Sequence, residues 1–173
     1  MSSIDWKQYG RVLVLIDTAN LSKGAEAIGK RVNYRNLAQV FRRGANLTRL
    51  VVYIADFGTQ AHGAFLDALR LNGFHIVSKP VKVVTPARKR IEHKANFDVE
   101  ITLDAMDWLE SYDTLVLFSG DSDFSGLVER LRSKGKRAIV CAMRHTISRE
   151  LQATAKLYVD VFRLGEGLLE WRS

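Results

Sequence analysis

The sequence predicts an α/β fold with a largely parallel sheet of about five to six strands and helices on both faces. Short apolar segments typical of strands alternate along the chain with segments whose apolar residues recur at the helical spacing. The first apolar segment, 11–17 (RVLVLID), is apolar at nearly every position, as in a strand covered on both faces. Ligands of such folds bind at the carboxyl ends of the strands, where the strand order reverses.

The individual elements follow from these patterns and from their capping residues. The expected strands are 11–17, 50–55, 74–78 with an extension over 81–84, 114–118, 137–143 and 157–162. The expected helices are 33–43, 60–72, 96–111, 124–135 and 147–154, and 21–29 is a short helix or a loop. Asn33 suits an N-cap, and Gly73 and Gly135 suit helix ends. The helix 60–72 is expected to turn four side chains to the core: Ala61, Phe65, Ala68 and Leu69.

Length and composition limit the class of protein. The chain has 173 residues without a linker or repeat, so we expect one domain over 1–173, with a core from about 11 to 162. The net charge of +7 and the pI near 9.7 favour an anionic partner, most often nucleic acid. The single cysteine, Cys141, excludes an internal disulfide and lies in an apolar segment, so we expect a buried thiol. We expect a cytoplasmic protein with no membrane contact, because no long apolar run or signal peptide is present.

Acidic residues follow two of the expected strands. Asp17 ends the first strand, and Asp121 and Asp123 follow strand 114–118 in a Gly-Asp-Ser-Asp turn. If these strands are neighbours, the three carboxylates converge and repel one another unless a cation neutralises them. Mg²⁺ or Mn²⁺ is the expected cofactor, because hard cations take oxygen ligands. Either Asp121 or Asp123 alone has a structural alternative as a helix N-cap.

Three further residues belong to this prediction. Asp98 lies in the first turn of the helix 96–111, where an acid also interacts favourably with the helix dipole. Asp104 is six residues later and points in another direction, so we place it away from the site. Asn20 follows Asp17 by three residues and either orients substrate or a metal-bound water, or caps the next helix.

Three segments carry a resemblance to a known family: Asp17–Asn20, Lys94–Met106 and above all Ser119–Val140, which begins SGDSDF. Together they resemble the NYN domain, the LabA-like branch of the PIN-like nucleases. The resemblance extends over almost the whole chain. Two departures from the family pattern are Phe97, where valine is usual, and Ser125–Gly126, where many members have a proline.

The resemblance implies a Rossmann-like (PIN-like) sheet and a metal-dependent ribonuclease centre. The family's catalytic and metal-holding positions correspond to Asp17, Asp98, Asp121 and Asp123, and its asparagine corresponds to Asn20. RNA is then the expected partner, and a homodimer is compatible with the prediction. The segment 79–94 is rich in basic residues, and five of them are expected to hold the RNA backbone beside the acidic site: Lys82, Arg88, Lys89, Arg90 and Lys94.

Three functions therefore compete. The first is a metal-dependent ribonuclease, in which Asp17, Asp98, Asp121 and Asp123 hold the metal. The second is a non-catalytic RNA-binding or regulatory module. The third is a phosphomonoester phosphatase of the haloacid dehalogenase type, which the pair of Asp17 and the GDSD turn superficially suggests. That superfamily places a second acid two residues after its nucleophile, whereas this chain has Ala19 there.

Overall fold

The computed structural model describes residues 4–81 and 96–172. Its main sheet has six strands in the order β4-β3-β1-β5-β6-β7, and every neighbouring pair is parallel. These strands are β1 (Arg11–Asp17), β3 (Asn46–Asp56), β4 (His75–Pro80), β5 (Thr114–Phe118), β6 (Arg137–Ala142) and β7 (Tyr158–Asp160). The predicted α/β class with a parallel sheet is confirmed.

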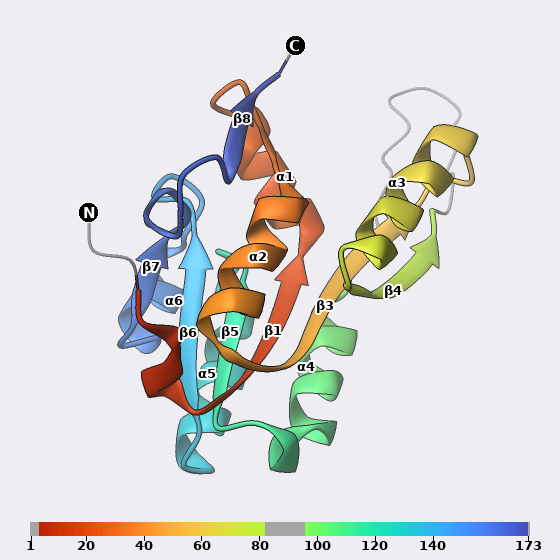
Figure 1. Cartoon of the computed structure of the whole chain (residues 1–173). Coiled ribbons are helices and arrows are strands. Elements are labelled where there is room, and N and C mark those ends of the chain that lie inside the picture. Colours follow the sequence, from red (N-terminus) through yellow and green to blue (C-terminus); the bar gives the residue numbers. More distant parts are fainter. Residues whose placement is uncertain (1–3, 82–95, 173) are drawn as a thin grey trace, which may run out of the picture.

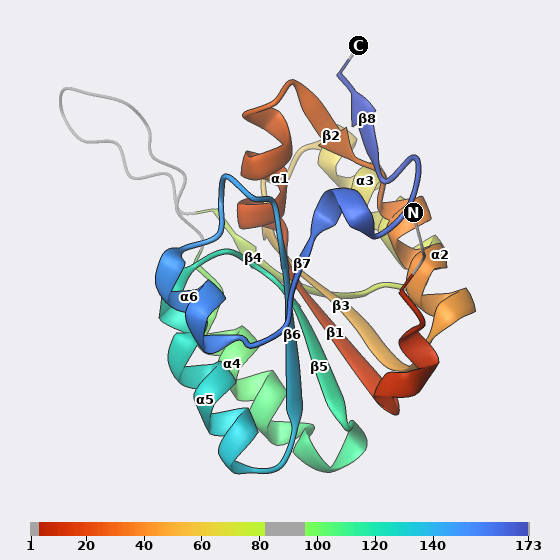
Figure 2. The same ribbon diagram turned by 90° about the vertical axis from the view of Figure 1, so that its left-hand side faces the viewer.

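Helices cover both faces of this sheet (Figure 1, Figure 2). The α-helices are α1 (Thr18–Glu26), α2 (Tyr34–Gly44), α3 (Gln60–Leu71), α4 (Asp98–Asp107), α5 (Ser125–Ser133) and α6 (Arg149–Thr154). Side chains of β1 alternate between two cores: Val12, Val14 and Ile16 pack with α1, α2 and α3, whereas Leu13 and Leu15 pack with α4, α5 and α6. This double burial explains why the segment is apolar at successive positions.

The face that α3 turns to the core differs in part from the predicted one, because Leu69 is the one buried residue of the four that were predicted. Leu66 and Leu69 are buried, whereas Ala61, Phe65 and Ala68 are exposed. The helix offers two apolar stripes, and it packs beside β4, the edge strand of the main sheet (Figure 1). The contact between α3 and the sheet is narrow, and Leu66 and Leu69 are sufficient to fill it.

A second, two-stranded sheet lies outside the main one and was not predicted. Its antiparallel strands are β2 (Lys30–Val32) and β8 (Leu169–Trp171). The backbone N–H of Asn33 extends the pairing by donating to the Leu168 carbonyl over 2.8 Å. The two strands are short and half polar, so neither has a clear strand pattern of its own.

Other boundaries shift by a few residues. The expected helix 96–111 is divided at Trp108 into α4 and a 3₁₀ turn, Leu109–Ser111. The expected strand 157–162 is shorter, because a 3₁₀ turn over Val161–Arg163 follows β7. No helix in residues 4–81 and 96–172 has the length and apolarity that crossing a membrane requires, and the cytoplasmic location stays a prediction.

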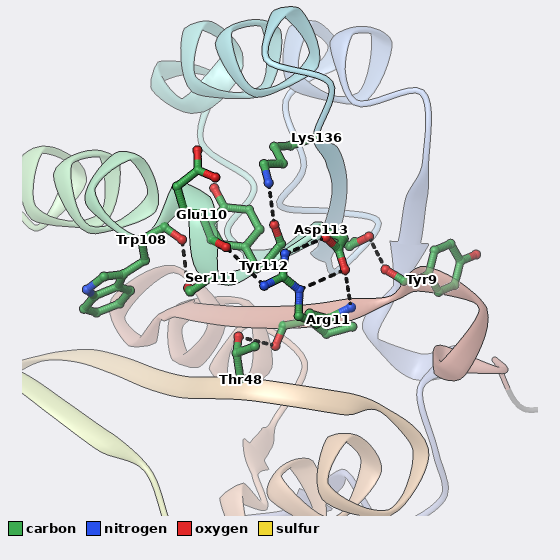
Figure 3. A network of polar contacts seen from close by, with 11 residues as sticks. Tyr9, Arg11, Thr48, Trp108, Glu110, Ser111, Tyr112, Asp113 and Lys136 are labelled. Carbon is green, nitrogen blue, oxygen red and sulfur yellow. Dashed lines mark hydrogen bonds and ion pairs between the residues drawn. The ribbon is translucent and has the colours of Figure 1, made fainter.

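A polar network fixes the amino ends of β1 and β5 (Figure 3). The Arg11 guanidinium donates to both carboxylate oxygens of Asp113, over 2.9 and 3.2 Å, and to the Glu110 carbonyl over 3.1 Å. The backbone N–H of Arg11 also donates to Asp113, over 2.8 Å. These bonds from Arg11 lower the pKa of the Asp113 carboxyl to about 2. Lys136 donates to the Tyr112 carbonyl at the same end.

Candidate functional site

The acidic residues lie where the strand order of the main sheet reverses. β1 lies between β3 and β5, so the chain leaves β1 on one side and returns on its other side. The carboxyl ends of β1 and β5 are adjacent, with Ile16 paired to Phe118. Asp17 therefore ends its strand beside the turn that follows β5, as the sequence predicted.

Three carboxylates form a compact group near the carboxyl ends of β1 and β5, which we call the carboxylate cluster. Asp98, Asp121 and Asp123 each offer one oxygen atom, and these atoms all lie within 4.8 Å of one another. Asp98 is the first residue of α4, and the other two belong to the turn after β5. The sequence led us to expect Asp17 in the company of Asp121 and Asp123. In the described part of the chain, Asp98 takes that place and Asp17 lies outside the group.

Asp17 is joined to the carboxylate cluster through Ser119. One carboxylate oxygen of Asp17 accepts the N–H of Asn20 over 3.1 Å, which makes Asp17 the N-cap of α1. The other oxygen accepts the Ser119 hydroxyl over 3.2 Å, and that hydroxyl accepts the N–H of Asp121 over 3.2 Å. Burial raises the pKa of Asp17, opposed by these hydrogen bonds and assisted by the charge of Asp98. The sequence analysis did not single out Ser119, although the Ser-Gly turn is visible in it.

The side chain of Asn20 holds the turn after β5. Its carbonyl oxygen accepts the N–H of Gly120 over 2.9 Å, so Asn20 bridges the ends of β1 and β5. The cap of α1 is Asp17, and the alternative role of Asn20 as that cap is wrong. Gly120 itself leaves no room for a side chain, because a Cβ there would clash with the Thr146 carbonyl. The Gly120 carbonyl accepts the N–H of Ser148 over 2.8 Å.

Asp98 is positioned by the turn that precedes α4. The side-chain oxygen of Asn96 accepts the backbone N–H of Asp98 over 2.7 Å. The pKa of the Asp98 carboxyl is raised, first by partial burial and then by the charges of Asp121 and Asp123. The site thus disfavours the ionised form of the residue that completes the carboxylate cluster.

Lys79 and Glu100 are two residues near this site that the sequence analysis missed. Glu100 forms an ion pair of 2.5 Å with Lys79, near the end of β4. The hydrogen bond from Lys79 lowers the pKa of Glu100. Lys79 also donates to the Asn96 carbonyl over 3.2 Å. These contacts link β4 to the start of α4 and so help to place Asp98.

Asp104 lies away from the carboxylate cluster, as its position on the helix predicted. Its carboxylate accepts the Tyr53 hydroxyl over 2.6 Å. The pKa of Tyr53 is raised by burial and by this neighbouring acid. Asp104 therefore has a structural role between α4 and β3.

The five predicted RNA-binding residues lie outside the described residues: Lys82, Arg88, Lys89, Arg90 and Lys94. Their role stays a prediction. The structure does show clustered carboxylate oxygens at the carboxyl ends of the central strands. Such a cluster suits a hard divalent cation.

Comparisons with known proteins agree with this architecture. The family model of the NYN domain matches residues 11–163. The chain is 30% identical over 155 residues to the low amplitude and bright protein LabA of Synechococcus elongatus, and the match covers 87% of this chain and 83% of that protein. A crystal structure of a protein of unknown function from Vibrio parahaemolyticus has a TM-score of 0.78 and 26% identity, and the match covers 98% of this chain and 100% of the other. The chain belongs to the NYN domain family.

Proposed function

We propose that this chain is a metal-dependent ribonuclease that hydrolyses RNA phosphodiester bonds at the carboxylate cluster. The observation that carries the proposal is the approach of Asp98, Asp121 and Asp123 to within 4.8 Å at the point where the strand order reverses. Membership in the NYN family supports a nuclease-like or regulatory module and favours RNA as the partner. The cytoplasm, where such a substrate occurs, is the proposed location.

The residues of the site fit Mg²⁺ or Mn²⁺. The donors are carboxylate oxygens, which hard cations prefer, and burial together with mutual repulsion raises the pKa of Asp98. We assign the metal to Asp98, Asp121 and Asp123, with Asp17 beside them through Ser119. A divalent ion bound by such residues lowers the pKa of a bound water and stabilises negative charge on a phosphoryl oxygen.

The protein's own contribution is to hold the acids in place. Asp17 and Asn20 fix the turn after β5 through Ser119 and Gly120, so the carboxylate of Asp121 is held before substrate arrives. In this proposal Asn20 acts by positioning that turn. The proposal is completed by contacts to the RNA backbone from five basic residues of segment 79–94: Lys82, Arg88, Lys89, Arg90 and Lys94. Such contacts give affinity without sequence preference.

The test is an RNA cleavage assay with purified protein and added Mg²⁺ or Mn²⁺. We expect cleavage that a chelator abolishes and that Asp98→Asn removes. Asp107→Asn is the matched control, because Asp107 is exposed at the other end of α4. Cleavage that survives in Asp98→Asn, or that is equally lost in Asp107→Asn, contradicts the proposed site.

A non-catalytic RNA-binding or regulatory module is the second candidate. The observation that favours it is that both carboxylate oxygens of Asp17 accept hydrogen bonds within the protein, so Asp17 has a structural role without any chemistry. Salt-sensitive RNA binding without metal-stimulated cleavage would support this candidate. A phosphomonoesterase is the third, and Ala19 stands where its second acid is needed.

A further inference from the structure

A cavity lies at the opposite end of the sheet from the carboxylate cluster. It has a volume of about 220 Å³ and is lined by residues of α5, of the start of β6 and of the connection from α6 to β7. Its apolar lining comes from Val128, Ala138, Ala155 and Leu157. The two alanines leave the space open. No aromatic side chain lines it among the described residues, so its interior suits an aliphatic group better than a stacked ring.

Four cations surround this apolar lining: Arg132, Lys136, Arg137 and Lys156. In the described parts of the chain, none of the four forms an ion pair with an acid. Lys136 and Arg137 each donate to a backbone carbonyl, that of Tyr112 and that of Gln8. Lys136 also lies over the Tyr112 ring, and its charge helps to lower the pKa of Asp113. Among the described residues, Arg132 and Lys156 are therefore the two cations at the mouth of the cavity without such a contact, and their charge favours an anionic group there.

The sheet adds a backbone donor to the same cavity. The N–H of Arg137 donates toward β5, to Asp113, and the N–H of Val140 donates toward β7, to Leu157. Because N–H groups alternate along a strand, the N–H of Ala138 also points to the β7 side. β7 pairs with β6 only from Val140 onward, so the structure as described has no strand opposite Ala138.

The backbone at the cavity is left-handed at one residue. Lys156 has a φ of 43°, and among the described residues it is the sole non-glycine residue with a positive φ. Its turn is closed by a hydrogen bond from the Leu157 N–H to the Ala155 carbonyl. Lys156 follows Ala155, the C-cap of α6, and a left-handed residue at this position is a common way to end a helix. Here it places a cation beside the apolar lining.

We propose that this cavity binds a small amphipathic anion: a short alkyl chain ending in a carboxylate or phosphate group. The alkyl chain occupies the space beside Ala138 and Ala155, and the charged head meets Arg132 and Lys156. This binding site is separate from the carboxylate cluster. Its failure would leave the proposed ribonuclease function untouched.

The test uses octanoate and the full chain, with binding followed by calorimetry and by backbone amide chemical shifts. We expect saturable binding, with shifts centred on Ala138 and Leu157, that weakens as salt is added. Octan-1-ol and acetate, which each lack one half of the ligand, should bind at least about tenfold more weakly. Tighter binding of octyl phosphate than of octanoate supports the site and identifies the preferred head group.

Two exposed substitutions make the test specific. Arg132→Gln and Lys156→Gln should each weaken octanoate binding about fivefold, whereas Arg43→Gln, on the far helix α2, should leave it unchanged. Ala138→Leu should fill the cavity and remove binding, with its fold checked by thermal unfolding. The proposal is overturned by the absence of saturable binding, by equal binding of octan-1-ol, or by unchanged affinity in both charge variants.

Discussion

Aspartates at the two ends of the same pair of strands have opposite electrostatic surroundings. At the amino ends of β1 and β5, Asp113 accepts three hydrogen bonds from Arg11, and its pKa falls to about 2. At the carboxyl ends, Asp17 and Asp98 have raised pKa values, because burial and neighbouring acids disfavour their charges. One end stabilises the ionised aspartate and the other disfavours it.

The difference shows that an aspartate can stabilise or destabilise the folded chain, depending on its neighbours. A carboxylate with a cationic partner stabilises the folded chain, whereas a group of carboxylates without one lowers its stability. A cluster of acids whose mutual repulsion lowers the stability of the folded chain is typical of a functional site. The predictions below test this contrast, beginning with the largest effect.

Asp121→Asn should reduce RNA cleavage at least about a hundredfold, which corresponds to about 2.7 kcal/mol of lost transition-state stabilisation. Asp113→Asn should leave cleavage per folded molecule unchanged, because Asp113 lies at the opposite end of β5. Initial rates on one RNA under excess Mg²⁺ or Mn²⁺ provide the comparison. Equal losses in the two variants would remove the contrast between the ends.

Divalent metal should stabilise the wild-type chain. At a metal concentration about a hundred times the Kd, binding adds about 2.7 kcal/mol to the free energy of unfolding and raises the melting midpoint by about 5 to 10 °C. Asp121→Asn should lose most of this increase, whereas Asp113→Asn should keep it. Thermal unfolding with and without MnCl₂ measures it, and an identical rise in both variants would point to binding elsewhere.

Asp113→Asn should lower the melting midpoint by about 3 °C at neutral pH, because Arg11 loses its charged acceptor. The pair is half exposed, so solvent screening limits the effect. The pKa of Asp113 is lowered on folding, so its contribution is present at neutral pH and is lost as the pH falls through about 2. A difference from wild type that persists unchanged at pH 2 would argue against a charge effect.

Asp98→Asn should raise the melting midpoint by about 1 to 3 °C at neutral pH without metal, since it removes a disfavoured charge. The folded chain binds this proton more tightly, so wild-type stability falls as the pH rises through the raised pKa. The gain should therefore shrink as the pH falls through about 4 and vanish below about pH 3, where Asp98 is protonated in both states. Glu129→Gln, on the exposed side of α5, is the control and should change little. Destabilisation by Asp98→Asn would contradict this reading.

The main sheet could be predicted because its strands are buried on both faces. β1 and β5 are apolar at successive positions, and a strand with that pattern has few alternatives. α3 could not be oriented in this way, because Phe65 and Leu66 lie on adjacent apolar stripes and only the neighbouring strands select one. β2 and β8 depend on pairing between distant residues, which local pattern does not report.

The acids of the site could be identified, but not their exact grouping. The ends of β1 and β5 follow from strand order, and this placed Asp17 beside Asp121. Asp98 joins Asp121 and Asp123 because of where α4 begins. The start of α4 is held by Lys79 of β4, which pairs with Glu100 and donates to the Asn96 carbonyl. Sequence separation hides such contacts.

The small sheet of β2 and β8 has a consequence for the order in which the chain folds. The Asn33 side chain donates to Glu170 over 2.5 Å, across 137 residues of sequence, so this contact closes a very long loop. The entropy of closing that loop must be met before the three-residue strands gain their few hydrogen bonds. Pairing of β8 is therefore expected to be among the last steps of folding and the first to open. Hydrogen exchange should report this as faster exchange at Asn33 than at Val14, in the centre of β1.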